Sequence, residues 1–123
     1  MNIKETAIAA YRNAKNKGFY DPAPSIESRL LLIHSEVSEA CEAIRKNHYT
    51  PRGDVDSVLS ITDPETFKKL FEVSVKNSFE DEIADTVIRC LDLCEGMGID
   101  LEAHIAAKMR YNAMRPHKHG KAF

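Results

Sequence analysis

The segment 26–47 carries an apolar seam that only a helix gathers onto one side. Its apolar residues recur at alternating spacings of four and three, the period of a helix face, at Ile26, Leu30, Ile33, Val37, Ala40 and Ile44. Two acids, Glu36 and Glu39, each precede a seam residue and therefore border the seam. The segment predicts a long helix that packs along its seam and brings a pair of carboxylates to the edge of that contact.

A second acidic pair borders the apolar stripe of another predicted helix. This helix begins at Ser78 and ends near Gly96 and Gly98, and its stripe comprises Ile83, Ala84, Val87, Ile88, Leu91 and Cys94. Glu82 and Asp85 lie at the edge of the stripe. At three-residue spacing, the two side chains of a pair are separated by only ~60° around a helix. If the two helices pack together, four carboxylates converge.

Four converging carboxylates predict a bound cation. Like charges at close quarters repel and raise each other's pKa unless a cation lies among them, and oxygen ligands favour a hard ion. A single acidic pair is usually a solvated helix face, but two pairs that border apolar seams favour a site. We predict Mg²⁺, with Mn²⁺ as a substitute. Iron is disfavoured because di-iron bundles use Glu-x-x-His, whereas His34 precedes Glu36 by two residues.

The remaining chain also has helical patterns and predicts an all-α fold. A helix over 3–17 ends at Gly18, Asp63-Pro64 begins another, and Asp100 caps a last helix that Pro116 stops. The stretch 48–62 has no clear period and is expected to be a loop. We therefore predict a single domain over 1–123, a bundle of four to five helices. Residues 48–77 would form an insertion with a short helix, and residues 116–123 a basic tail.

Charge, hydropathy and cysteine spacing exclude some classes of partner and predict the cell compartment. A formal net charge of -2 lacks the basic excess of a general nucleic-acid binder, so no nucleic-acid polymer is expected. No apolar run is long enough to cross a bilayer, and the amino terminus has no signal-type segment, so no membrane is expected. The three cysteines lack Cys-x-x-Cys spacing and are expected to be reduced core residues of a cytoplasmic protein.

The last predicted helix carries a polar stripe suited to phosphate. Lys108, Asn112 and Arg115 recur at spacings of four and three, which places an ammonium, an amide and a guanidinium on one face. The alternative is a solvated basic tail, and Tyr111 beside the stripe could simply pack. A glycine-rich phosphate loop, a Gly-x-Ser-x-Gly elbow and a His-Glu-x-x-His motif are all absent from the sequence.

Three segments together carry a family resemblance. They are residues 31–40 with Glu-x-x-Glu, residues 81–89 with Glu-x-x-Asp, and residues 108–116 with Lys-x-x-Tyr-Asn-x-x-Arg-Pro. The chain resembles the MazG-like all-α nucleoside triphosphate pyrophosphohydrolases over most of residues 3–121. The combination of the three motifs is much more specific than any one of them.

The resemblance implies an enzyme and an assembly. It implies a helical homodimer or homotetramer that depends on Mg²⁺ and hydrolyses a nucleoside triphosphate between its α and β phosphates, giving the monophosphate and pyrophosphate. By motif position, the metal ligands would be Glu36, Glu39, Glu82 and Asp85, and the phosphate-binding residues would be Lys108, Asn112 and Arg115, with Tyr111 beside them. Relatives often hold a tryptophan near the base in a region where this chain has Phe19 and Tyr20.

The chemistry of these parts suggests a mechanism. Magnesium would bridge carboxylates and phosphate oxygens and acidify a water, and a carboxylate would take the proton. Glu39 is our choice for that base, with Glu36 nearly equal, and Lys108 and Arg115 would hold the leaving pyrophosphate. The alternative is a non-catalytic helical module that binds nucleotides or protein, with the acids as a surface or interface feature.

Overall fold

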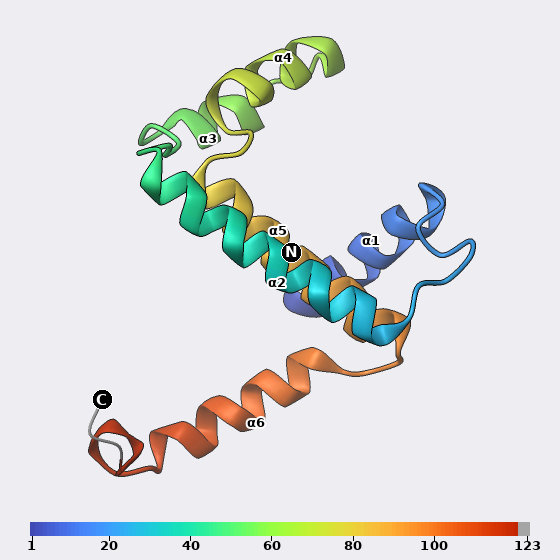
Figure 1. The fold of residues 1–123 in the computed structure, drawn as a ribbon, viewed down its shortest axis with the longest axis vertical. Coiled ribbons are helices and arrows are strands. Elements are labelled where there is room, and N and C mark those ends of the chain that lie inside the picture. The colour runs from blue at the N-terminus through green and yellow to red at the C-terminus, as the bar shows by residue number, and fades with distance from the viewer. Residues whose placement is uncertain (121–123) are drawn as a thin grey trace. The chain divides into compact units, whose positions relative to one another are not determined.

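The computed structural model describes residues 1–120, and the side chains of residues 1–118. Within this range the chain forms six α-helices and a short 3₁₀-helix, and no strand (Figure 1). The helices are α1 (Ile3–Asn16), α2 (Ile26–Arg45), α3 (Asp54–Leu59), α4 (Pro64–Ser74), α5 (Phe79–Gly96), α6 (Leu101–Ala113) and η1 (His117–Gly120). The predicted all-α class is confirmed. The end of the predicted basic tail, residues 121–123, lies outside the described residues.

The chain divides into two compact units. Unit 1 comprises Met1–Ala23 and the described part of Leu91–Phe123, and unit 2 comprises Pro24–Cys90. Helix α5 contributes residues 79–90 to unit 2 and residues 91–96 to unit 1. All four acids of the predicted metal site belong to unit 2.

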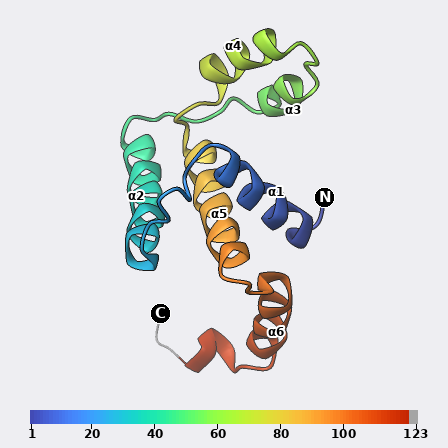
Figure 2. The ribbon, with the colours of Figure 1, turned by 90° about the vertical axis from the view of Figure 1, so that its right-hand side faces the viewer.

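Unit 2 is built on an antiparallel pair, α2 and the first part of α5 (Figures 1 and 2). At one end of the pair, the backbone N–H of Phe79 donates to the carbonyl of His48 at 2.9 Å. The Ser78 side chain, 0% exposed, lies 2.8 Å from the Thr50 hydroxyl, and the Thr50 N–H donates to Glu80 at 2.9 Å. These contacts fix the end of α2 beside the start of α5.

Two helices, α3 and α4, pack against each other within unit 2 (Figure 2). Helix α4 begins as predicted, because Asp63 accepts from the Thr66 N–H at 2.9 Å and Pro64 occupies the first turn. Helix α3 corrects the predicted loop over 48–62. Its six residues, Asp54–Leu59, are too few to show a helical period, and its N-cap, Gly53 (φ 89°), provides no side-chain hydrogen bond.

Unit 1 contains α1, the end of α5 and α6. Asn2 forms a capping box with Glu5 at the start of α1, and Gly18 takes a left-handed φ of 85° just after the helix, as its predicted role as terminator requires. Asp100 caps α6 by accepting from the Ala103 N–H at 3.0 Å, as predicted. Helix α1 packs on α6 near Lys4.

Much of the apolar surface predicted to be buried is exposed. On α2, Ala40 is 3% exposed, whereas Leu30 is 48%, Val37 46% and Ile44 49% exposed. Cys41 is also exposed, which corrects the expectation of a core residue. The seam of α2 is therefore only partly covered by this chain.

None of the helices in residues 1–120 combines the length and apolar character needed to cross a membrane.

Candidate metal centre

Three of the four predicted carboxylates meet between α2 and α5. Glu36, Glu82 and Asp85 each offer a carboxylate oxygen, and these oxygens all lie within 4.8 Å of one another. Glu36 and Glu82 are each 6% exposed, and Asp85 is half-buried. We call these three residues the acidic trio. Acids on a solvated helix face would be exposed, so this burial sets the trio apart from such a face.

The position of the trio follows from local sequence. Glu82 and Asp85 are three residues apart on α5 and so share one side of that helix. Across from them, Glu36 lies on α2 one turn before Ala40, a small residue that is itself buried. The antiparallel course of α2 and α5 then brings the middle of α2 level with the acids of α5.

Glu39, the fourth predicted ligand, lies beside the trio and outside it. Its side chain is exposed, and the oxygens that lie within 4.8 Å of one another do not include one from Glu39. A hydrogen bond with Glu36 and the negative charge of that residue raise the pKa of Glu39, and the charge of Asp85 adds to the effect. Glu39 is therefore electrostatically linked to the trio while remaining open to solvent.

Arg89 lies at the trio but is not among the site residues predicted from sequence. Its Nε donates to Oε1 of Glu36 at 2.7 Å. Burial raises the pKa of Glu36, but the hydrogen bond from Arg89 leads the effects that outweigh burial, so the net pKa lies below its ordinary value. Arg89 follows Asp85 by four residues, which places it on the same side of α5, and that spacing is the signal that could have identified it.

The other two members of the trio hold their protons more tightly than usual. Burial, a hydrogen bond with Glu36 and the charges of Glu39, Glu36 and Asp81 raise the pKa of Glu82 to about 7. Burial and the charges of Asp81 and Glu36 likewise raise the pKa of Asp85. Negative charge thus exceeds what Arg89 offsets, and a divalent cation would relieve the excess. The all-oxygen donors fit Mg²⁺ or Mn²⁺.

This excess of negative charge predicts how the stability of the metal-free protein depends on pH. A carboxyl group with a raised pKa binds its proton more tightly in the folded state, so its contribution is present below the unfolded value of 4.5 and is lost as the pH rises towards about 7. Glu36, with a lowered pKa, acts in the opposite sense but below this window. With EDTA present, we expect the unfolding midpoint to fall by roughly 5 °C between pH 5.5 and pH 8.

The Glu82→Gln variant tests the origin of that fall by thermal unfolding at both pH values. It should lose much of the pH dependence and unfold at a higher temperature than wild type at pH 8. Glu42→Gln removes the same charge from an exposed position of α2, where Glu42 pairs with Arg45 at 3.0 Å, and should behave as wild type. An unchanged pH dependence in Glu82→Gln would show that the ionisation of Glu82 does not cause the fall in stability.

The predicted phosphate-binding residues form a cluster in unit 1. The Lys108 Nζ lies 5.1 Å from the centre of the Tyr111 ring, and the Arg115 Cζ lies 5.6 Å from it. Among the described residues, the buried Oδ1 of Asn112 has no hydrogen-bond partner. Two cations on one ring make a surface suited to a polyanion.

The residues predicted near the base, Phe19 and Tyr20, differ in their surroundings. The Tyr20 hydroxyl donates to Asp92 Oδ1 at 2.7 Å, and its ring meets the Tyr11 ring edge-on, with centroids 5.0 Å apart. Phe19 is 69% exposed. Tyr20 therefore has a structural role within unit 1, and the expectation that it lies near a base stays a prediction.

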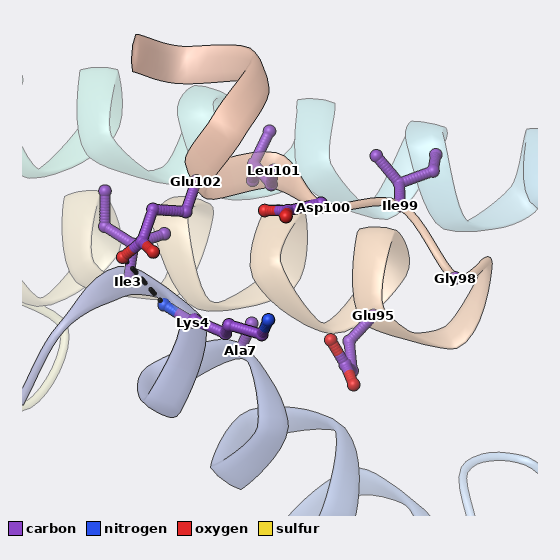
Figure 3. Close-up of a pocket in the computed structure, with 9 residues that line it drawn as sticks. All are labelled: Ile3, Lys4, Ala7, Glu95, Gly98, Ile99, Asp100, Leu101 and Glu102. Atoms are coloured by element: carbon purple, nitrogen blue, oxygen red, sulfur yellow. Dashed lines mark hydrogen bonds between the residues drawn. The ribbon is translucent and has the colours of Figure 1, made fainter.

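Unit 1 also has a hollow of about 220 Å³ where the start of α1 meets the turn between α5 and α6 (Figure 3). There the backbone N–H of Lys4 donates to Glu102 at 3.4 Å, with Glu95 and Asp100 nearby (Figure 3). None of the predicted site residues lines this hollow, so we assign it no part in the site.

Comparison with protein-family models finds no match to this chain. Comparisons with curated proteins and with solved structures also find none.

Proposed function

We propose that the chain is a Mg²⁺-dependent nucleoside triphosphate pyrophosphohydrolase of the MazG-like kind that its motifs resemble. One observation carries the proposal, the approach of carboxylate oxygens from Glu36, Glu82 and Asp85 to within 4.8 Å of one another. Three carboxylate oxygens at this spacing can hold a divalent cation, and enzymes that act on triphosphates use such a cation. The substrate would be a ribo- or deoxyribonucleoside triphosphate, either canonical or aberrant.

The acidic trio would hold the Mg²⁺. Arg89 keeps Glu36 ionised and oriented through its 2.7 Å hydrogen bond, as partners of metal ligands commonly do. When bound there, the ion supplies positive charge beside the phosphates and makes nearby water more acidic.

Glu39 is the base in this proposal. It is exposed, so it can reach water, and its raised pKa makes it a better proton acceptor than an ordinary glutamate. Glu36, its rival, is buried and engaged by Arg89. Water would attack the triphosphate, the bond between the α and β phosphates would break, and Glu39 would take the proton of the water. The products are a nucleoside monophosphate and pyrophosphate.

The cluster of Lys108, Tyr111, Asn112 and Arg115 would hold the phosphates. Lys108 and Arg115 carry the charges that neutralise a leaving pyrophosphate. The contacts of both cations with the Tyr111 ring reduce their freedom before substrate arrives, which lowers the entropic cost of binding.

A nucleotide panel with Mg²⁺ tests the function. We expect at least one nucleoside triphosphate to give monophosphate and pyrophosphate in equal amounts, with no product when EDTA is present. Release of orthophosphate alone would contradict the proposed bond cleavage. Nucleotide binding without any product would assign the non-catalytic module, which the exposed apolar surface of α2 also favours.

The exposed seam supports assembly into a homodimer or homotetramer. Large apolar side chains of unit 2 stand exposed on both long helices, at Leu30, Leu31, Val37, Ile44, Ile83, Val87 and Ile88. Large apolar side chains exposed along both helices of a pair favour an interface, so a second copy of the chain is the occupant we propose.

Size-exclusion chromatography with light scattering checks the assembly. We expect wild type to have at least twice the chain mass of 13.9 kDa. The Leu30→Glu, Leu31→Glu double variant should shift it towards the monomer, because burying two charges in an apolar interface is costly. Glu27→Gln, an exposed change on the same helix, serves as control. A wild type that is monomeric at every concentration would remove this part of the proposal.

A further inference from the structure

A cavity of about 390 Å³ opens between α4 and the start of α5, within unit 2. Phe67 and Phe71 of α4 form an aromatic wall, and Asp81 and Asp85 of α5 and Asn77 from the connection between the helices also line the cavity. Asp85 belongs both to this wall and to the acidic trio. Whatever occupies the cavity therefore lies next to the candidate metal centre.

The aromatic wall suits a flat ring. Phe67 and Phe71 are one helical turn apart, their ring centroids are 6.0 Å apart and their planes differ by 30°, so the two rings form a continuous apolar surface. Phe67 is 37% exposed, so its ring is accessible to a ligand. Aromatic surfaces of this kind stack nucleobases irrespective of sequence.

The charges of the lining argue against phosphate in this cavity. Lys68 and Lys76 contribute two positive charges, whereas Glu72, Asp81 and Asp85 contribute three negative ones. A polyanion would be repelled overall, but an uncharged heterocycle would not. Its edge could bond with the lysines, with Glu72 and with the amide of Asn77, which offers both a donor and an acceptor.

A hydrogen bond made by the connection between α4 and α5 fixes the conformation of Asn77. Asn77 adopts a left-handed φ of 65°, and its backbone N–H donates to Asp81 Oδ2 at 2.8 Å. Asparagine tolerates that conformation better than most residues. The hydrogen bond engages the backbone of Asn77, which leaves the side-chain amide for other partners.

We propose that this cavity, and not the region of Phe19 and Tyr20, receives the nucleobase of the substrate, with Phe67 and Phe71 as the stacking surface and Asn77 hydrogen-bonding to the edge of the ring. The inference rests on the proposed function, because that function requires a nucleotide substrate whose phosphates would lie at the acidic trio. A volume of about 390 Å³ is in the range of small-molecule sites. The insertion over 48–77 thereby gains a role in substrate selection.

A fluorescence experiment tests base binding without turnover. The chain has no tryptophan, so Phe71→Trp places a single indole at the cavity. Without added metal, uncharged nucleosides should quench its emission in a saturable manner, whereas ribose, which lacks a base, should not. A Leu70→Trp protein, with its indole on the same helix outside the lining, serves as control. Equal quenching of both proteins, or none in Phe71→Trp, overturns the proposal.

Kinetics supply the second readout. If the chain hydrolyses a triphosphate, the Phe67→Ala, Phe71→Ala double variant should raise KM roughly tenfold or more, the loss expected from one stacked base, with a smaller change in kcat. Leu70→Ala should match wild type, and circular dichroism should show both variants folded. An unchanged KM in the folded double variant overturns the proposed base site without contradicting the proposed hydrolase activity. Quenching of Phe71→Trp fluorescence without any hydrolysis supports the proposed base site and contradicts the proposed hydrolase activity.

Discussion

Glu39→Gln should abolish most of the turnover of nucleoside triphosphates while leaving the metal and the substrate bound. Loss of a general base typically costs 10²–10⁴-fold in rate, and we expect kcat to fall by roughly that factor with KM changed little. The reason is geometric, since Glu39 stands outside the trio of oxygens that lie within 4.8 Å of one another. Pyrophosphate release under saturating Mg²⁺ measures the effect.

Glu42→Gln is the matched control for this experiment. Glu42 lies on α2 three residues further on, is exposed, and pairs with Arg45 and Lys46. Its replacement removes the same charge from the same helix and should leave kcat as in wild type. If Glu39→Gln retains wild-type kcat, Glu39 is not the base, and the rival assignment to Glu36 becomes the one to test.

Asp85→Asn should weaken divalent metal binding by at least about 100-fold, because it removes one of three carboxylates that share the ion. We expect Mg²⁺ to raise the unfolding midpoint of wild type at pH 8 and to have little effect on the variant, since a ligand stabilises only the protein it binds. Thermal unfolding with increasing Mg²⁺ measures the difference. Without metal, the variant should be at least as stable as wild type, because a charge that burial and Asp81 disfavour has been removed.

The control for Asp85→Asn is Asp56→Asn, an exposed change on α3 that should respond to Mg²⁺ as wild type does. Equal stabilisation of wild type and Asp85→Asn by Mg²⁺ would show that the ion binds elsewhere. A metal-free variant that unfolds at a lower temperature would instead indicate that Asp85 supports the fold.

The local features of the fold could be predicted from sequence because each depends on a few neighbouring residues. Asp63 and Asp100 cap their helices as expected, since a cap needs only its own side chain and a backbone N–H three residues on. The sharing of one side of α5 by Glu82 and Asp85 is equally local. Helix α3 was not predicted, because six residues are too few to show a helical period of apolar residues.

The non-local features could not be predicted in the same way. The hydrogen bond between Arg89 and Glu36 joins residues 53 positions apart, and no local rule pairs them. The cavity next to the trio joins Phe67 and Phe71 of α4 with Asp81 and Asp85 of α5, and no local rule brings these residues together. Periodicity marked Val37 as part of a seam, yet it cannot tell whether this chain or a second copy covers the seam.

The most direct measurement is a crystal structure of the protein grown with Mn²⁺, with the ion located by its anomalous scattering. We expect one strong peak per chain within bonding distance of carboxylate oxygens from Glu36, Glu82 and Asp85, with Arg89 still donating to Glu36. A peak at other residues, or carboxylates of α2 and α5 that point apart into solvent with no ion between them, would contradict the proposed metal centre.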